Sequence, residues 1–312
     1  MSCLRCGKPL DGAPTNNEHV LGRWLARRTD NTQMIIRDSR RQYGKLQIPV
    51  HTACNSEMRR LETVMTAAFD AQTTEALLAV PAADLGAWAC KAMYGLVVIS
   101  GSPEGVTANS TDEEAGDFVF IRDLLIKLRS MFRGFFDGDV PTDAIAVRAY
   151  RTLWDRQARD FTFWLTDENA GTLFVQLDSV AVFVSVFDSN YIDAHDDRYT
   201  RAADALELNP LQIYEIYCRH LAFLEARSTV RLTRPVPEGD TFDLVCEGVS
   251  TPAPPDPFYY RYLLWKKLSV GGGFSEDQFV PDTWLLDAIG RPRHLPLEAT
   301  RRARSRRLRR QR

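Results

Sequence analysis

The sequence predicts an α+β protein made of a small N-terminal module, held together by a metal ion, and a larger domain of helices and antiparallel strands. Two short pairs of potential metal ligands lie within the first 54 residues. Helical and strand-like segments follow one another without regular β–α–β alternation, and 45% of the 312 residues are hydrophobic, enough for a substantial core. We therefore expect the module at 1–65, a companion domain at 66–300 and a disordered Arg-rich tail at 301–312.

Charge is distributed unevenly along the chain. Residues 1–62 carry 11 Lys and Arg against 6 Asp and Glu, and residues 301–312 carry 8 Arg and no acidic residue. The part between them holds 20 basic and 35 acidic residues, although the whole chain has a net charge of only −2. Contacts with a polyanion are therefore expected on the module and the tail. The tail could bind nucleic acid, an acidic partner or the acidic middle of the chain.

The N-terminus gives no sign of export or of a membrane anchor. It lacks a basic segment followed by an apolar one, and no unbroken apolar run reaches the length of a membrane helix. We therefore expect a soluble, cytoplasmic protein without membrane contact, whose thiols stay reduced.

The N-terminal module should begin with a turn, because residues 3–12 combine two cysteines with Gly and Pro. Short elements are expected next: a helix around Trp24 and strands at 34–36 and 46–48. A longer amphipathic helix should follow from Ser56, a plausible cap, because Met58, Leu61 and Met65 recur at helical spacing.

The companion domain should combine core helices with one antiparallel sheet. Apolar residues recur with helical periodicity in some segments, and short β-branched or aromatic runs are bounded by turn residues in others. The expected helices are 83–99, 118–136, 201–227 with a break near Pro210, and 259–268. The expected strands are 161–165, 172–177, 180–187, 229–233 and 241–246.

Four residues of the module have the types and spacing of a structural zinc site. Cys3-x-x-Cys6 and His51-x-x-Cys54 are pairs that a tight turn can aim at one ion, and together they form a Cys₃His set. The alternative, small buried residues that fall three apart by chance, is less favoured. The remaining cysteines lie in apolar segments and are expected to be buried and inert. They are Cys90, Cys218 and Cys246.

The order of these blocks resembles the HNH endonuclease family, over about the first fifth of the chain. The blocks are Cys3-x-x-Cys6-Gly7, then Glu18-His19 with Trp24-Leu25, then His51-x-x-Cys54-Asn55 with Leu61-Glu62. The resemblance implies a zinc-knuckle, treble-clef or ββα-metal fold: a β-hairpin followed by a helix. His51 stands where the family usually has a cysteine.

The same resemblance implies a catalytic role for three residues. His19 would be the general base that takes a proton from the attacking water, because neutral imidazole can accept a proton near pH 7. Glu18 and Asn55 would hold a catalytic Mg²⁺ or Mn²⁺, since hard cations prefer oxygen ligands. Asn55 stands where the family commonly has its final histidine, and the middle asparagine of the motif has no clear match.

Each of these residues also has a plain structural interpretation. Glu18 or Asn17 could cap the following helix while His19 packs against its neighbours, and Asn55 could be a helix N-cap. Glu62 is expected to face solvent, and Trp24 to belong to the core. The basic residues nearby could bind phosphate or simply be solvated. They are Arg23, Arg27, Arg28, Arg37, Arg40, Arg41 and Lys45.

The rest of the chain has no clear catalytic motif. His195-Asp196-Asp197, with Asp188, is more typical of a polar turn than of a metal site, and Gly271-Gly272-Gly273 lacks the context of a phosphate loop. The expected function is a metal-dependent endonuclease acting on nucleic acid, DNA in the first instance. The alternatives are a non-catalytic zinc module that binds nucleic acid or a protein, or a defence or toxin nuclease that cuts only when triggered. A protein partner could bind at 66–300.

Overall fold

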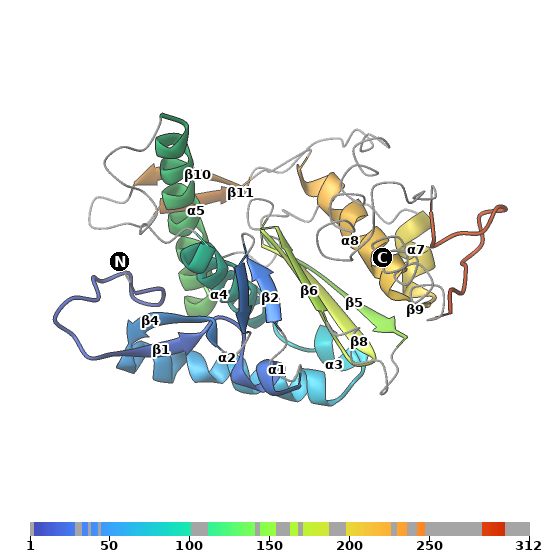
Figure 1. The fold of residues 1–312 in the computed structure, drawn as a ribbon, viewed down its shortest axis with the longest axis horizontal. Coiled ribbons are helices and arrows are strands. Elements are labelled where there is room, and N and C mark those ends of the chain that lie inside the picture. Colours follow the sequence, from blue (N-terminus) through green and yellow to red (C-terminus); the bar gives the residue numbers. More distant parts are fainter. Residues whose placement is uncertain are drawn as a thin grey trace, which may run out of the picture.

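The computed structural model describes residues 3–28, 33–36, 39–42, 45–100, 112–140, 144–153, 163–167, 171–186, 198–225, 230–235, 242–246 and 283–296. It is an α+β structure with a mixed sheet, antiparallel sheets and helices (Figure 1). The expected helix at 259–268, the Gly271 run, the His195 segment and the tail at 301–312 lie outside the described residues.

The described helices are, in order, α1 Arg23–Arg28, α2 Thr52–Asp70, α3 Thr74–Leu78, α4 Ala82–Ser100, α5 Asp112–Asp137, α7 Arg198–Asp204 and α8 Pro210–Glu225. The strands are β1 Thr15–His19, β2 Gln33–Ile36, β3 Ser39–Gln42, β4 Gln47–His51, β5 Ala146–Thr152, β6 Phe163–Asp167, β7 Thr172–Leu177, β8 Val180–Ser185, β9 Glu207–Leu208, β10 Val230–Pro235 and β11 Phe242–Cys246.

In the N-terminal part, an antiparallel strand pair lies beside a long helix. β1 pairs with β4, with Thr15 opposite His51 and His19 opposite Gln47, and α2 begins directly after β4 (Figure 1). β2 pairs with β3 in a separate hairpin between them. The predicted helix around Trp24 and the strands at 34–36 and 46–48 are confirmed, whereas β1 and β3 were not predicted.

Helix α2 begins four residues earlier than the sequence indicated. Its first residue is Thr52 and its N-cap position is His51, whose side chain makes no capping hydrogen bond. Ser56 lies inside the helix and its hydroxyl donates to the Thr52 carbonyl. The predictions of Ser56 or Asn55 as the cap are therefore wrong. The His51 ring nitrogens already lie against Cys6 Sγ and the Pro9 carbonyl, so the side chain is not available to cap its own helix.

The larger sheet has strand order β6-β7-β8-β5-β9, and its strands β7 and β8 are buried on both faces. Alternate residues of β7 and β8 point to opposite sides. One set, which includes Val175 and Val182, joins the core formed with α2, α4 and α5. The other set, which includes Phe174 and Phe183, joins a core formed with α7 and α8. The sheet is thus the middle layer between two groups of helices (Figure 1).

The sheet differs from the prediction in two ways. Among the described strands, β10 and β11 pair only with each other, so the five predicted strands do not make one sheet there. Two further strands complete the larger sheet: β5, which is antiparallel to β8, and β9, which is parallel to β5. The break near Pro210 is confirmed, because β9 lies between α7 and α8.

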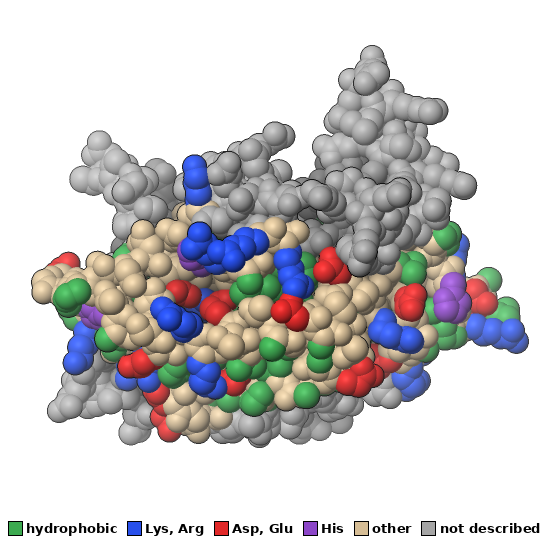
Figure 2. Space-filling view, turned by 90° about the horizontal axis from the view of Figure 1, so that it is seen from below, with side chains coloured by type: hydrophobic (Ala, Val, Ile, Leu, Met, Phe, Trp, Pro, Cys, Tyr) green, Lys and Arg blue, Asp and Glu red, His purple; other side chains and the backbone are tan. Residues whose placement is uncertain are grey.

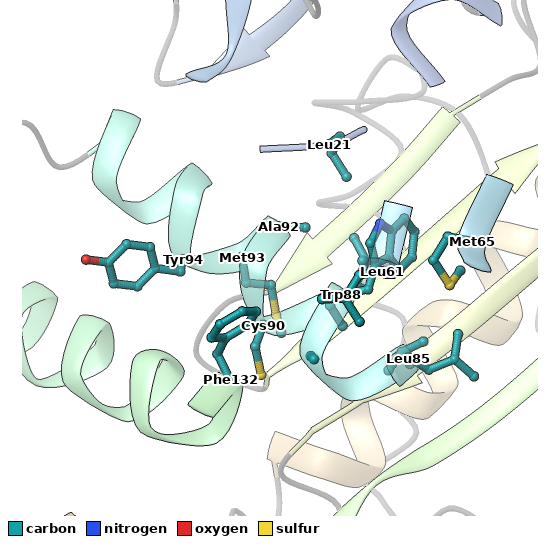
Figure 3. Packing of buried hydrophobic residues seen from close by; sticks show 14 of the residues in the cluster. Leu21, Leu61, Met65, Leu85, Trp88, Cys90, Ala92, Met93, Tyr94 and Phe132 are labelled. Atoms are coloured by element: carbon teal, nitrogen blue, oxygen red, sulfur yellow. The ribbon is translucent and has the colours of Figure 1, made fainter. Parts of the chain in front are cut away.

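Helix α4 is the central core helix. Within the described residues, the one segment long and apolar enough to cross a membrane is Ala82–Ile99, and 78% of it is buried inside the molecule, as in the core helix of a soluble protein. Figure 3 shows Trp88 of α4 beside Leu61 and Met65 of α2, with Phe132 of α5 beside Cys90. The helices predicted at 83–99 and 118–136 are confirmed by α4 and α5.

The hydrophobic core is continuous across the expected domain boundary near residue 65. Helix α2 passes through this position, and one cluster joins Val20 and Leu61 to Trp88 and Val175. The segment after β1 lies very close to α4: a Cβ atom on Gly95 would come within 2.4 Å of Val20 Cγ2. The division at 65 stays a prediction from sequence.

Candidate metal centre

The four predicted ligands form one cluster. Their ligand atoms, the three Sγ atoms and a ring nitrogen of His51, lie within 4.8 Å of one another. Zinc with bonds of about 2.0–2.3 Å in a tetrahedron needs ligand atoms roughly 3.5–4 Å apart, so a small contraction would complete the site. The cluster could hold a metal ion, is compatible with zinc and fits a zinc-knuckle module.

The first cysteine pair is shaped by a tight turn. The Gly7 N–H donates to the Cys3 carbonyl, and the Cys3 N–H donates to the Lys8 carbonyl. Gly7 has a φ of 72°, a conformation that glycine adopts without steric cost. The turn brings Cys3 and Cys6 to the same side, as a pair of metal ligands requires.

His51 is oriented by its own second hydrogen bond. Its Nε2 lies 3.1 Å from the Pro9 carbonyl oxygen. Because a carbonyl can only accept, Nε2 carries the proton, and the lone pair of a neutral ring is left on Nδ1. Nδ1 lies 3.2 Å from Cys6 Sγ. A backbone carbonyl that orients the ring is the usual arrangement for a metal-binding histidine.

The thiols repel one another as anions. Burial and the neighbouring Cys3 and Cys6 raise the pKa of Cys54 to about 12. For Cys3, burial alone would raise the pKa, but hydrogen bonds from the backbone N–H groups of Cys6, His51 and Arg5 lower it below its ordinary value. A bound cation would compensate three thiolates in this space, which is the electrostatic condition for zinc.

Glu18 lies about 9% exposed at the other end of β1 and pairs with a buried lysine. Its Oε1 accepts from Nζ of Lys91, which is 0% exposed in the middle of α4, and Nζ also donates to Glu62 Oε1. Burial alone would lower the pKa of Lys91, but the charges of Glu62 and Glu18 outweigh it and raise the pKa. The capping role for Glu18 and the solvent-facing position for Glu62 are therefore wrong.

Glu62 is enclosed by neighbouring groups. Its Oε2 accepts from Trp24 Nε1 at 2.9 Å. A Cβ atom on Gly22 would lie 1.8 Å from this same carboxylate oxygen, so a glycine is needed for the chain to pass. The Trp24 ring packs on Phe69 with ring centroids 5.4 Å apart, which confirms the prediction that Trp24 belongs to the core.

His19 lies next to Glu18 and is partly exposed. The Gln47 amide donates to His19 Nε2 across the β1–β4 pair, with the two nitrogen atoms 2.9 Å apart. Burial is the main cause that lowers the pKa of His19, and it is opposed by the charge of Glu18 and aided by that of Lys91. The ring is therefore neutral at physiological pH.

Asn55 lies in the first turn of α2. Its Nδ2 donates to Asn16 Oδ1 at 2.8 Å. Glu18, in contrast, binds Lys91 and lies near Glu62, two helical turns further along α2. In this arrangement the two residues offered as ligands for a catalytic cation have different partners, and they do not fit a shared Mg²⁺ or Mn²⁺.

Basic side chains near the module are partly engaged in ion pairs. Arg28 pairs with Asp70 and lies 3.9 Å from Asp178, whereas Arg23, Arg27 and Lys45 are exposed. On the face shown in Figure 2, acidic and basic side chains are interspersed among the described residues rather than separated by sign. The side chains of Arg37, Arg40 and Arg41 lie outside the described part of the structure.

Sequence reasoning missed Lys91, Gln47 and the role of Glu62. One signal was available for Lys91: it is the single lysine in the apolar segment 82–100. Its partners were not readable, because Glu18 lies 73 residues earlier in the chain. The cysteines expected to be inert include Cys90 and Cys218, which are buried, and burial raises the pKa of Cys90.

Comparison of the chain with models of protein families, with curated proteins and with solved structures finds no match.

Proposed function

We propose that this chain is an HNH-type, metal-dependent endonuclease that hydrolyses phosphodiester bonds, with DNA as the expected substrate. The observation that supports this best is the placement of His19. His19 is the last residue of β1, and Thr15 at the other end of β1 pairs with His51. Zinc bound by His51 and the three cysteines would therefore fix the strand that carries His19. A neutral, partly exposed imidazole beside a carboxylate is a suitable general base.

In the proposed reaction His19 takes the proton from the attacking water. With Gln47 donating to Nε2, the neutral ring carries its proton on Nδ1. Half a turn of the Gln47 amide would place its oxygen against Nε2–H and leave Nδ1 free to accept.

The test is cleavage of plasmid DNA by the zinc-loaded full chain with Mg²⁺ or Mn²⁺. We expect His19→Ala to lower the rate by about 100-fold or more, in the wild type or, where the wild type does not cleave, in the Lys91→Gln variant, because a general base contributes that much. Zinc content and melting temperature should stay as in the wild type. His294→Ala, which changes an exposed histidine far along the chain, is the matched control and should cleave normally. No cleavage of DNA or RNA by either the wild type or a Lys91→Gln variant would contradict the proposal.

The second candidate is a non-catalytic zinc module that binds nucleic acid or a protein partner. One observation favours it: Lys91 already neutralises Glu18, the carboxylate that a catalytic cation would need. This candidate predicts that His19→Ala and His294→Ala, which both keep the four metal ligands, bind a partner but cleave no nucleic acid. Gel-shift measurements with DNA and RNA, run beside the cleavage assay, separate the two functions.

A further inference from the structure

The two carboxylates that converge on Lys91 come from separate elements of the module. Glu18 is on β1 and Glu62 is on α2, and one oxygen of each accepts from the same ammonium group. The side chain of Lys91 is 0% exposed, whereas those of Glu18 and Glu62 are 11% and 19% exposed. The ammonium therefore closes the pair from inside the protein, and the carboxylates lie between it and solvent.

A lysine at this buried position contributes less to stability than an apolar residue would. Apart from Asp84 in its first turn, the other buried side chains of α4 are hydrophobic, and a buried ion pair usually adds less stability than well-packed apolar residues of similar size. One lysine also compensates only one of the two carboxylates. The group as a whole keeps a charge of −1, so it retains an attraction for cations.

We propose that Lys91 is a built-in cation that occupies the point where Glu18 and Glu62 would otherwise bind a divalent metal ion, so that the module is held in a latent state. The idea that the latent module withholds cleavage rests on the proposed function. The competition between the Lys91 ammonium and a divalent cation for Glu18 and Glu62 does not. Removal of the Lys91 ammonium would free both carboxylates together, because each is bound to the same Nζ.

The competition is tested by cation binding to the zinc-loaded full chain. Tb³⁺ is a suitable probe because Trp24 donates to Glu62 and lies close enough to sensitise its luminescence. We expect Lys91→Met to gain Trp-sensitised Tb³⁺ luminescence that Mn²⁺ displaces, and the wild type to show none. Saturating Mn²⁺ should raise the melting temperature of Lys91→Met by about 5 °C and leave that of the wild type unchanged.

The matched control is the triple variant Glu18→Gln, Lys91→Met, Glu62→Gln, which removes the lysine and both carboxylates and should show neither effect. Lys91→Arg keeps the positive charge and should behave like the wild type. If Lys91→Met does not fold, Lys91→Gln serves in its place, because an amide can still donate to one carboxylate. It should show the same gains.

Two results would overturn the competition. In the first, neither Lys91→Met nor Lys91→Gln gains luminescence or a melting-temperature response. In the second, the wild type binds Tb³⁺ as Lys91→Met does and loses it on Glu18→Gln, because the cation would then bind beside the lysine. The cleavage assay distinguishes the two proposals: a variant that gains Mn²⁺ but cuts no DNA or RNA supports the competition and contradicts the nuclease.

Discussion

At the scale of single residues, the orientation of His51 shows that the four metal ligands are positioned by contacts within two short segments. The ring is fixed by a carbonyl of the same turn that carries Cys3 and Cys6, so the ligand set depends on contacts among residues 3–9 and 51–54. The thiols repel one another in the absence of a positive ion. Metal binding and folding of this turn are therefore expected to be coupled.

We predict that Cys6→Ser lowers the zinc content from about one ion per chain to none and lowers the melting temperature, because a structural site needs four ligands. Elemental analysis of the purified protein and thermal unfolding measure the two effects. Cys90→Ala is the matched control: this buried thiol lies outside the cluster, so its removal should leave the zinc content unchanged. Retention of zinc by Cys6→Ser would show that the cluster is not the metal site.

A second residue, His220, makes stability depend on pH. Burial, followed by the charges of Arg148 and Arg219, lowers its pKa from 6.5 to about 3 in the folded protein, where Nε2 lies 2.7 Å from Tyr150 Oη. The unfolded chain binds a proton below about pH 6.5, whereas the folded chain does not until about pH 3. The stabilisation is thus complete above pH 6.5 and is lost as the pH falls toward 3.

Urea unfolding at pH 7.5 and pH 5.0 measures this effect. Between these values we expect the wild type to lose about 2 kcal/mol more than His220→Gln, at about 1.4 kcal/mol per pH unit below 6.5. Glutamine is the appropriate comparison because it keeps a polar partner for Tyr150 and does not titrate. Equal losses in the two proteins would mean that His220 does not carry the effect.

At the scale of elements, α4 is the helix on which the N-terminal strands and the larger sheet meet. Lys91 and Gly95 lie one turn apart and face Glu18 and Val20, two residues apart in and after β1. The lysine supplies a charge and the glycine supplies room. This stripe of α4 therefore fixes both the distance and the register of β1.

The close approach of Gly95 to Val20 predicts that alanine at position 95 destabilises the protein, although alanine favours a helix more than glycine does. Alanine there gains up to about 1 kcal/mol in helix propensity, but its Cβ would lie 2.4 Å and 2.9 Å from the two Cγ atoms of Val20. Overpacking of this kind costs about 1–3 kcal/mol, so Gly95→Ala should be destabilising by up to about 2 kcal/mol after the gain in helix propensity.

The double variant checks this explanation. In a Val20→Ala background the clashing atoms are absent, and Gly95→Ala should then be neutral or stabilising. Chemical denaturation of the four proteins forms a double-mutant cycle. If Gly95→Ala lowers the free energy of unfolding equally in both backgrounds, contact with Val20 is not the cause of the loss.

The elements predicted correctly have regular apolar periodicity, and those missed do not. β7, β8, α4 and α5 are apolar runs whose ends are marked by turn residues. β1 reads Thr-Asn-Asn-Glu-His, with no apolar residue to indicate a strand, and it is defined by its pairing with β4. In the same way, the metal ligands were readable because their spacing is local. The partner of Glu18 was not, because an ion pair across 73 residues leaves no local pattern.

At the scale of the whole molecule, the core does not divide where the sequence motif ends. One hydrophobic cluster contains Cys3 and Leu4 from the knuckle, Trp88 from α4 and Val184 from the sheet. Arg5 adds polar contacts with Glu57 on α2, inside the expected module, and with Asp137 at the end of α5, outside it. The cysteine-bearing turn is thus attached to the larger region by an ion pair with α5 as well as by the shared core.

The position of Lys91 also limits how this sequence can be inherited or transplanted. A gene recombination event that joined residues 1–70 to an unrelated protein would carry Glu18 and Glu62 without their counterion, and Val20 without the glycine against which it packs. A junction after Ser100 would keep the whole group together. The segment inherited as a unit should therefore extend through α4 to Ser100, about forty residues beyond Glu62, the last residue of the motif.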